Sequence, residues 1–217
     1  MYLRPRVFFS TSICTSRPPH HGNRLISFFL SGQYIFPPTF SSQVNLFACR
    51  NLHSAALRHL ADTCTNLSSL NIDEVCINQY EQWSQETPYQ VNYLSDASVN
   101  HLLEVRGGTL RKLWIDGESL SDASFSNFHK MESLELLSIS FSDNLGPSGL
   151  HSISLLKCLE WLRLRRGAEL EPQHFVTAFE LGELHRLTYL DLSECSKLDD
   201  SGLAAIAKTC PNLGSVR

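Results

Sequence analysis

One spacing of apolar residues recurs along most of the chain. In its clearest copy, Leu184, Leu187, Leu190 and Leu192 are followed by Cys195. Other segments keep the same spacing: Cys64, Leu67, Leu70 and Ile72; Gly107, Leu110, Leu113 and Ile115; Met131, Leu134, Leu137 and Ile139; Leu156, Leu159, Leu162 and Leu164; and, shortened, Cys210, Leu213 and Val216. Successive copies begin 24 to 28 residues apart, except for 43 residues between Cys64 and Gly107. A period in the twenties indicates a stack of similar units.

Each unit contains one expected strand and one expected helix. The end of the apolar phrase alternates between apolar and other residues, as in a strand. Asp199 and Asp200 precede Leu203 and Ile206, which is typical of a helix start, and Ser95-Asp96 and Ser121-Asp122 repeat this signal. We therefore predict an α/β leucine-rich-repeat solenoid, a horseshoe with parallel strands on its concave face and helices on its convex face.

The register of the repeats divides the chain. Counting back one period from Cys64 places a degenerate first repeat near Pro38, so we assign residues 38–217 to a repeat domain of about six to seven repeats. The 43-residue gap indicates a loop insertion near residues 77–93, which we expect to be mobile. Residues 1–37 do not fit the repeat and form an irregular or disordered N-terminus. They contain Arg but no acidic residue, as a mitochondrial transit peptide would, although a gene-prediction artefact is an alternative.

The cysteine positions add a family resemblance. Cys at the first repeat position, Cys after the strand, and the Asp-Asp-Ser-Gly-Leu-Ala-Ala-Ile-Ala-Lys-Thr-Cys-Pro-Asn-Leu sequence of residues 199–213 resemble the cysteine-containing repeats of F-box/LRR-repeat proteins. Val75, Glu118, Ser142 and Gly167 depart from the post-strand Cys. In that family an F-box binds the adaptor Skp1 and the repeats hold the substrate. No F-box pattern occurs in residues 1–37, so we interpret the chain as a fragment that lacks it.

The residues between the buried strand positions define an expected binding surface. Within a strand, alternate side chains point to opposite faces, so these residues belong to the concave face. Trp and Arg are frequent at the centres of interfaces, and Arg163, Arg165 and neighbouring Arg166 could receive an acidic or phosphorylated segment. Alternatively, these Arg residues pair with Asp191 and Asp116 on adjacent strands, and Trp114 and Trp161 pack across neighbouring strands. The predicted partner-binding residues are Trp114, Asp116, Trp161, Arg163, Arg165, Tyr189 and Asp191.

Composition narrows the function classes. The 217 residues are 42% hydrophobic, with 18 basic and 22 acidic residues and a net charge of −4. This balance gives no reason to expect binding to nucleic acid or to a membrane. Seven cysteines without a C-x-x-C pair argue against a disulfide framework or a zinc module and favour a reducing compartment. We find no catalytic constellation, metal-ligand spacing or phosphate loop, and we expect a monomer without cofactors.

These observations leave three functional hypotheses. The first is a non-enzymatic protein-binding module, the substrate-recognition part of an SCF-type (Skp1–cullin–F-box) ubiquitin ligase, cytoplasmic or nuclear, with Skp1 as a partner only through an upstream F-box. The second is a mitochondrial assembly factor similar to the leucine-rich-repeat proteins called ATP synthase subunit s-like. The third is a leucine-rich-repeat scaffold with no link to a ligase.

Overall fold

Strands and helices alternate along the residues that the computed structural model describes, which are 42–49, 52, 54–74 and 94–217. The strands are β1 (Gln43–Asn45), β2 (Ser69–Ile72), β3 (Lys112–Asp116), β4 (Leu136–Ser140), β5 (Trp161–Leu164), β6 (Tyr189–Asp191) and β7 (Ser215–Val216). The α-helices are α2 (Ser54–Thr63), α3 (Asp96–Arg106), α4 (Asp122–Phe125), α5 (Pro147–Ser154), α6 (Pro172–Leu181) and α7 (Asp200–Thr209). Two short 3-10 helices, η3 (Gly107–Thr109) and η4 (Phe128–Lys130), follow α3 and α4.

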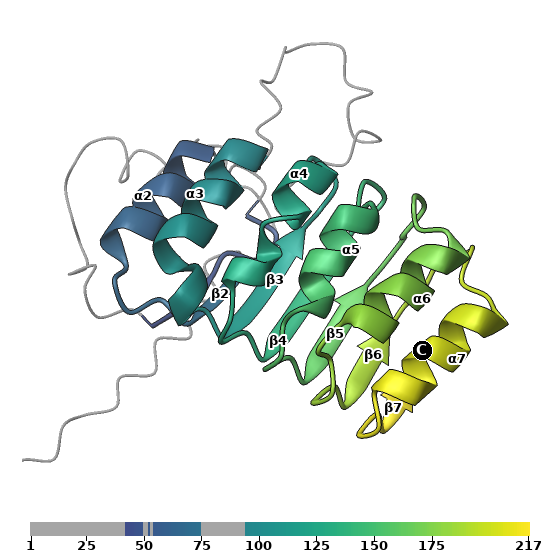
Figure 1. Ribbon diagram of the computed structural model, residues 1–217. Coiled ribbons are helices and arrows are strands. Elements are labelled where there is room, and N and C mark those ends of the chain that lie inside the picture. Colours follow the sequence, from purple (N-terminus) through teal and green to yellow (C-terminus); the bar gives the residue numbers. More distant parts are fainter. Residues whose placement is uncertain (1–41, 50–51, 53, 75–93) are drawn as a thin grey trace, which may run out of the picture.

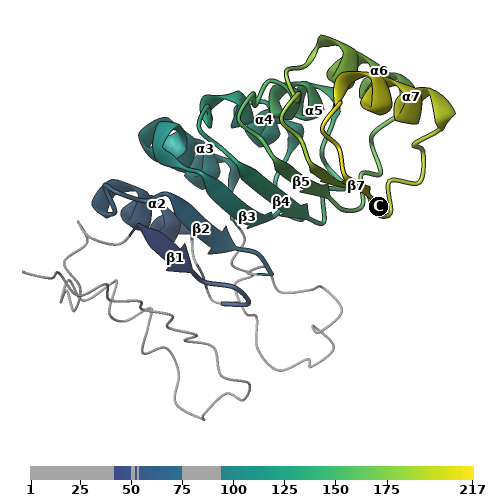
Figure 2. The same cartoon turned by 90° about the horizontal axis from the view of Figure 1, so that it is seen from below.

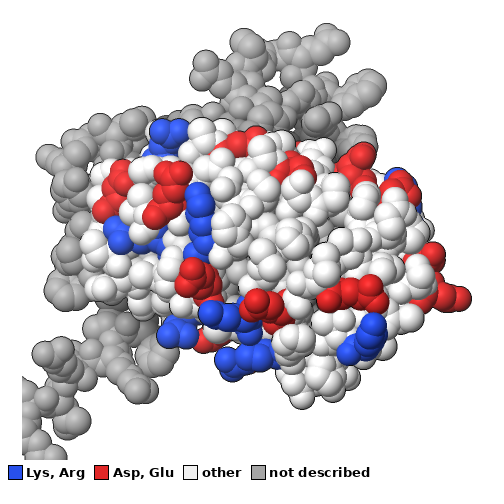
Figure 3. Space-filling model, in the orientation of Figure 1, with Lys and Arg blue, Asp and Glu red and all other residues white. Residues whose placement is uncertain are grey.

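The seven strands form one open parallel sheet in the order β1 to β7, so each strand pairs with the next one in the chain. The helices stand side by side in a second layer on one face of the sheet (Figures 1 and 2). Seen from the side of the helices, the surface carries both basic and acidic side chains (Figure 3). Within the described part of the chain, no helix lies on the opposite face (Figure 2), which we call the helix-free face. The predicted α/β class with parallel strands and helices on one side is therefore confirmed.

The core consists of aliphatic residues that the strand register aligns. Leu70, Leu113, Leu137, Leu162 and Leu190 pair with one another across β2 to β6, and each of them is fully buried. Ile72, Ile115, Ile139 and Leu164 form a second buried row two residues further on. These are the positions that the repeating apolar phrase predicted. Each row is completed only by neighbouring units, because a single strand cannot enclose its own side chains.

The helix starts lie where the sequence predicted them. Ser95, Ser121 and Asp199 are the N-cap residues of α3, α4 and α7. The Asp199 carboxylate accepts hydrogen bonds from the amides of Ser201 and Gly202, which would otherwise lack a partner at the helix end. The Ser201 hydroxyl also donates to this carboxylate, at 2.6 Å, and this hydrogen bond is the largest cause of the lowered pKa of Asp199. The two amides add to it, since all three hydrogen bonds favour the ionised carboxylate.

Acidic residues also connect the starts of α3, α4 and α5. Asp96 accepts hydrogen bonds from the amide and the hydroxyl of Ser121, at 2.9 and 2.7 Å. Burial raises the pKa of Asp96, but the hydrogen bonds outweigh it and leave this pKa below its ordinary value. Asp122 Oδ1 then accepts from the amides of Gly146 and Gly149, at 2.9 and 2.7 Å. A Cβ atom at Gly149 would lie 2.6 Å from that oxygen, so only glycine allows this approach.

Three of the four described cysteines of the phrase fit a structural role. Cys64, Cys195 and Cys210 are buried, whereas Cys49 is partly exposed. Burial raises the pKa of the Cys64 and Cys195 thiols and raises that of Cys210 to about 11. These three side chains are therefore protonated, poorly nucleophilic fillers of the core at neutral pH.

Three sequence predictions lie outside the described residues. They concern the irregular N-terminus of residues 1–37, the start of the repeat domain near Pro38, and the insertion near residues 77–93 with its expected mobility.

The contact from Asp122 to the start of α5 yields a stability prediction. Asp122→Ala removes the acceptor for two amides, since Gly146 at the N-cap of α5 has no side chain of its own. We expect a loss of about 2 kcal/mol in the free energy of unfolding, measured by urea denaturation. Asp122→Asn keeps an acceptor oxygen and should lose much less. Equal losses for the two variants would contradict this role of the carboxylate.

Candidate functional site

Two rows of side chains line the helix-free face of the sheet. The strand register places Lys112, Leu136, Trp161 and Tyr189 side by side on β3 to β6, and we call them the first row. Two residues further along each strand lies the second row, with Asn71, Trp114, Ser138, Arg163 and Asp191. The buried leucines between the rows point toward the helices. The sheet therefore brings Trp161, Tyr189, Arg163 and Asp191 together on neighbouring strands.

An aromatic stack dominates the first row. The rings of Trp161 and Tyr189 lie parallel, with an interplanar angle of 5° and their centroids 4.7 Å apart. Both residues are partly exposed, as is Leu136 beside Trp161. We call Leu136, Trp161 and Tyr189 the aromatic ledge. Trp and Tyr in such a setting provide a large apolar area together with a hydrogen-bonding group.

The structure places the other predicted aromatic residue elsewhere. Trp114 lies in the second row on β3, which is separated from Trp161 on β5 by β4. The two tryptophans therefore do not lie on neighbouring strands, whereas Trp161 itself does pack across neighbouring strands, as the alternative expected. The partner of Trp161 is Tyr189, which occupies the same position of the repeating phrase. Equal position in the phrase, rather than residue type alone, was the signal that could have identified this pair.

The predicted arginines all have acidic neighbours. Arg163 Nε lies 3.4 Å from Asp191 Oδ2, a contact too long and poorly oriented for a good hydrogen bond, and this nitrogen is buried without a hydrogen-bond partner. Arg165 Nη2 lies 2.7 Å from Glu194 Oε1, and Arg166 Nη2 lies 3.3 Å from Asp143 Oδ2. The ion-paired alternative therefore holds for Arg163 with Asp191, whereas Arg165 and Arg166 pair with acids that the sequence had not indicated.

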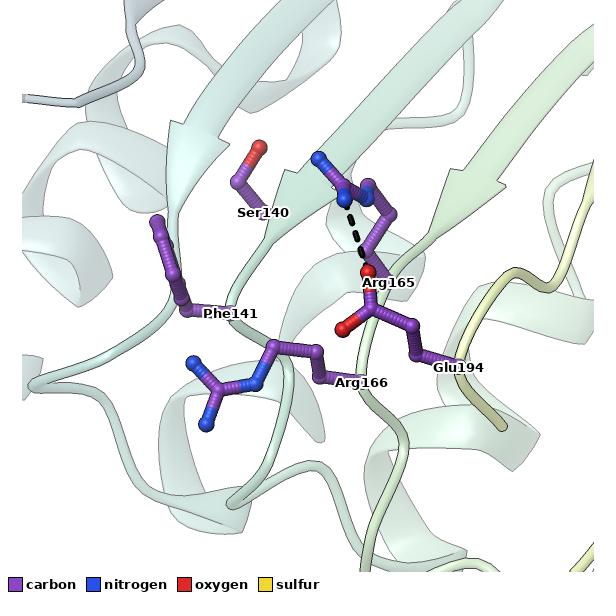
Figure 4. Close-up of a pocket in the computed structure, with 5 residues that line it drawn as sticks. All are labelled: Ser140, Phe141, Arg165, Arg166 and Glu194. Carbon is purple, nitrogen blue, oxygen red and sulfur yellow. Dashed lines mark hydrogen bonds and ion pairs between the residues drawn. The ribbon is translucent and has the colours of Figure 1, made fainter. Parts of the chain in front are cut away.

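A small pocket of about 200 Å³ lies at the carboxyl ends of β4 to β6. Its lining residues are Ser140, Phe141, Arg165, Arg166 and Glu194, and Figure 4 shows the ion pair of Arg165 with Glu194 on one side of it. The Arg166 guanidinium lies over the Phe141 ring, 5.2 Å from its centre. Both cations already have a carboxylate neighbour, so the pocket offers an incoming anion little unpaired positive charge.

Backbone strain at the pocket belongs to the architecture of the chain. Phe141, Arg166 and Glu194 have φ angles of 55°, 64° and 66°, in the left-handed region that non-glycine residues seldom adopt. Ala48 and Glu74 have the same conformation, and all five residues lie four positions after the core residue that the strand register aligns. The conformation recurs after β1, β2, β4, β5 and β6, and so it is a feature of the turns rather than a mark of one active site.

Asp116 and Asp191, two predicted binding residues, are buried, with exposed fractions of 1% and 4%. Asp191 Oδ1 accepts a 3.0 Å hydrogen bond from the Ser193 amide and another hydrogen bond from the Ser193 hydroxyl. Asp116 Oδ1 accepts from the Glu118 amide, also at 3.0 Å. Each side chain thus closes the turn that follows its strand, a role that short acidic side chains commonly have. The carboxylates of Asp116 and Asp191 therefore stabilise turns of the protein itself.

A further buried carboxylate, Asp73, which is not among the predicted partner-binding residues, lies just after β2. Asp73 Oδ2 accepts a 3.0 Å hydrogen bond from the hydroxyl of Ser140, which is 67 positions away in the chain, and Asp73 Oδ1 accepts from the Glu74 amide. Burial raises the pKa of Asp73, and the nearby negative charges of Asp116 and Glu74 add to this effect. The two hydrogen bonds oppose it without cancelling it.

The raised pKa of Asp73 predicts a pH-dependent contribution to stability. The folded protein binds a proton at Asp73 more readily than the unfolded chain does, so stability falls as the pH rises from the unfolded pKa through the folded one. Asp73→Asn keeps groups that can bond to Ser140 and Glu74 but carries no charge. We expect urea denaturation to show this variant to be more stable than the parent at pH 7, and this advantage should shrink toward pH 4. An advantage that is constant with pH would contradict the assignment.

Residues 42–49, 52, 54–74 and 94–217 contain no group of three or more His, Cys, Asp or Glu side chains that could hold a metal ion. Over the same residues, no helix is both long and apolar enough to cross a membrane.

Comparisons with known proteins give little guidance. No family model matches the sequence, and no curated protein matches it. One solved structure that resembles the chain is described as the crystal structure of the Rad7 and Elc1 complex in yeast. The match has 22% sequence identity and a TM-score of 0.39, and it covers 74% of this chain. The chain spans less than half of that protein, 45% of its length, and a likeness at this level carries no argument about function.

Proposed function

We propose that this chain is a non-enzymatic protein-binding module, a leucine-rich-repeat solenoid that holds its partner on the helix-free face. The observation that carries this proposal is the Trp161–Tyr189 stack, partly exposed on a face that no described helix covers. Aromatic side chains of this kind are frequent at the centres of protein interfaces, because they bury a large area at a small cost in conformational entropy.

The repeat assignment has support from the geometry of the units. One strand and one helix alternate, each strand pairs in parallel with the next, and buried leucines align across five consecutive strands. The left-handed residues recur at one position of the unit. Such arrays commonly use the surface formed by their strands to bind proteins.

Within this class, we propose a substrate-recognition role in an SCF-type ubiquitin ligase and thus in ubiquitin-dependent protein catabolism. The support is the cysteine-containing repeat pattern of residues 184–216, which resembles that of F-box/LRR-repeat proteins. The buried Cys195 and Cys210 are consistent with that pattern and with a reducing compartment such as the cytoplasm or nucleus. Skp1 would join through an F-box elsewhere in the full product.

Affinity capture can test the ligase role. The longest product of the gene is expressed with an affinity tag, and Skp1 in the captured material is measured by immunoblotting. We expect Skp1 to co-purify with the longest product and not with the present 217 residues. A longest product that carries no F-box and captures no Skp1 would refute the ligase role, while the protein-binding assignment would stand.

Site-specific photo-crosslinking tests the binding face itself. A benzoylphenylalanine at position 136, within the aromatic ledge, should crosslink a protein partner in cells. The same group at position 177 is the control, because Thr177 is an exposed residue of α6 in the helix layer. We expect a crosslinked band at least five-fold stronger from position 136. Equal bands, or a stronger band from position 177, would place the partner on another surface.

A mitochondrial assembly factor is the second candidate. It is favoured by the N-terminal sequence, where Arg4, Arg6, Arg17 and Arg24 precede the first acidic residue, Asp62. If the protein is a mitochondrial assembly factor, a fluorescent protein fused to residues 1–60 should enter mitochondria. A diffuse signal would exclude it.

A further inference from the structure

The aromatic ledge is bordered by charges that pair among themselves. On the side where the strands begin, Arg111 pairs with Glu135 at 2.6 Å, and Arg186 pairs with Glu160 at 2.7 Å. On the other side, Arg163 lies against Asp191. Lys112 differs from these residues: it is exposed beside Leu136 in the first row and has no ion pair within the described residues. Lys112 is therefore a positive charge next to the aromatic ledge that no described carboxylate neutralises.

The first row is also rich in hydrogen-bond donors that have no partner. Among the residues that the structure describes, neither the indole N–H of Trp161 nor the hydroxyl of Tyr189 makes a hydrogen bond within the protein. The Lys112 ammonium adds three more donor hydrogens. A surface with these donors is complementary to a ligand that is rich in acceptors and poor in N–H groups.

A polyproline-II segment has this chemistry. It has no internal hydrogen bonds, so its carbonyl groups are free to accept, and its proline residues have no N–H. Surfaces lined by aromatic side chains are the usual binding sites for proline-rich segments, and such a segment loses little conformational entropy on binding because it is already extended.

The spacing of the strands favours the same conformation. Adjacent strands lie about 4.8 Å apart, so Lys112 on β3 and Trp161 on β5 are separated by about 10 Å across the sheet. A polyproline-II chain presents side chains on one side every third residue, about 9.3 Å apart. In an extended β-strand, side chains on one side are about 6.7 or 13 Å apart, and neither distance matches.

We infer that the aromatic ledge and Lys112 bind a proline-rich segment in polyproline-II conformation, in which an apolar residue lies on Trp161 and Tyr189 and an acidic residue three positions away pairs with Lys112. This inference rests on the proposed function, since it assigns a ligand class to the same face. Unlike the proposed function, it predicts that the protein prefers ligands with an acidic residue and with a three-residue spacing between the acidic and the apolar residue.

Fluorescence anisotropy with synthetic peptides tests the inference on the full 217-residue chain. The probe is fluorescein-labelled Pro-Asp-Pro-Pro-Phe-Pro-Pro, and a second probe has the order of Asp and Phe reversed, since the direction of binding is not specified. We expect saturable binding by at least one of them. The matched peptide with Asn in place of Asp should bind about three- to five-fold more weakly, the effect of one exposed ion pair.

Variants of the protein identify the contacts. Lys112→Ala should weaken binding of the Asp peptide by the same factor and leave binding of the Asn peptide unchanged. Lys112→Arg should retain most of the affinity for the Asp peptide. Lys208→Ala, which changes a lysine of α7 in the helix layer, is the control and should have no effect. Trp161→Ala should weaken the binding of both peptides. Tyr189→Phe, which keeps the stack, should weaken both to a smaller extent.

The possible outcomes separate the inference from the proposed function. Equal binding of the Asp and Asn peptides, or tighter binding when Asp and Phe are two or four residues apart, would overturn the inference. Self-association of the chain that Trp161→Ala abolishes would also overturn it, by making a second copy the occupant. If no peptide binds but position 136 still crosslinks a protein partner, only the inference fails. If no peptide binds and position 136 crosslinks no protein partner, both proposals fail.

Discussion

The alignment of one leucine per strand is the constraint on which the rest of this structure depends. Leu70, Leu113, Leu137, Leu162 and Leu190 are fully buried, and each is enclosed only because the strands on both sides place an equivalent residue beside it. A shift of one residue in any strand would turn its apolar side chains to the opposite face of the sheet. The register therefore fixes which side chains can face solvent and which pack against the helices.

Polar groups at the edges of the sheet and of the helix layer reinforce that register. Asp96 and Asp122 each hold the start of the next helix, so a carboxylate of one unit satisfies the amides of its neighbour. Asp116 and Asp191 close the turns after their strands, and Asp73 reaches Ser140 across the end of the sheet. The acidic residues that would look functional in a list of candidates thus stabilise the junctions between units, which leaves the aromatic ledge as the strongest remaining candidate for binding.

The helix-free face owes its chemistry to this separation between acidic residues that stabilise the junctions and aromatic residues that stay partly exposed. The charged residues beside the ledge neutralise one another, and Lys112 is left without an ion pair in the part of the chain that the structure describes. Such a surface has a defined apolar centre and little general attraction for charge. The proposed proline-rich ligand would be selected by its shape, its acceptor groups and a single acidic residue, rather than by a general attraction for anions.

The sequence by itself determined the periodic elements of this protein. A short apolar phrase and a capping residue are local signals, so the buried rows and the helix starts at Ser95, Ser121 and Asp199 could be predicted from spacing alone. The tertiary structure decided the pairings. Trp161 stacks on Tyr189, and Arg165 meets Glu194, because the strand order and the turns after each strand set these contacts. Burial of Asp116 and Asp191 was likewise not readable from the sequence, since it depends on how the neighbouring strands and turns close around each carboxylate.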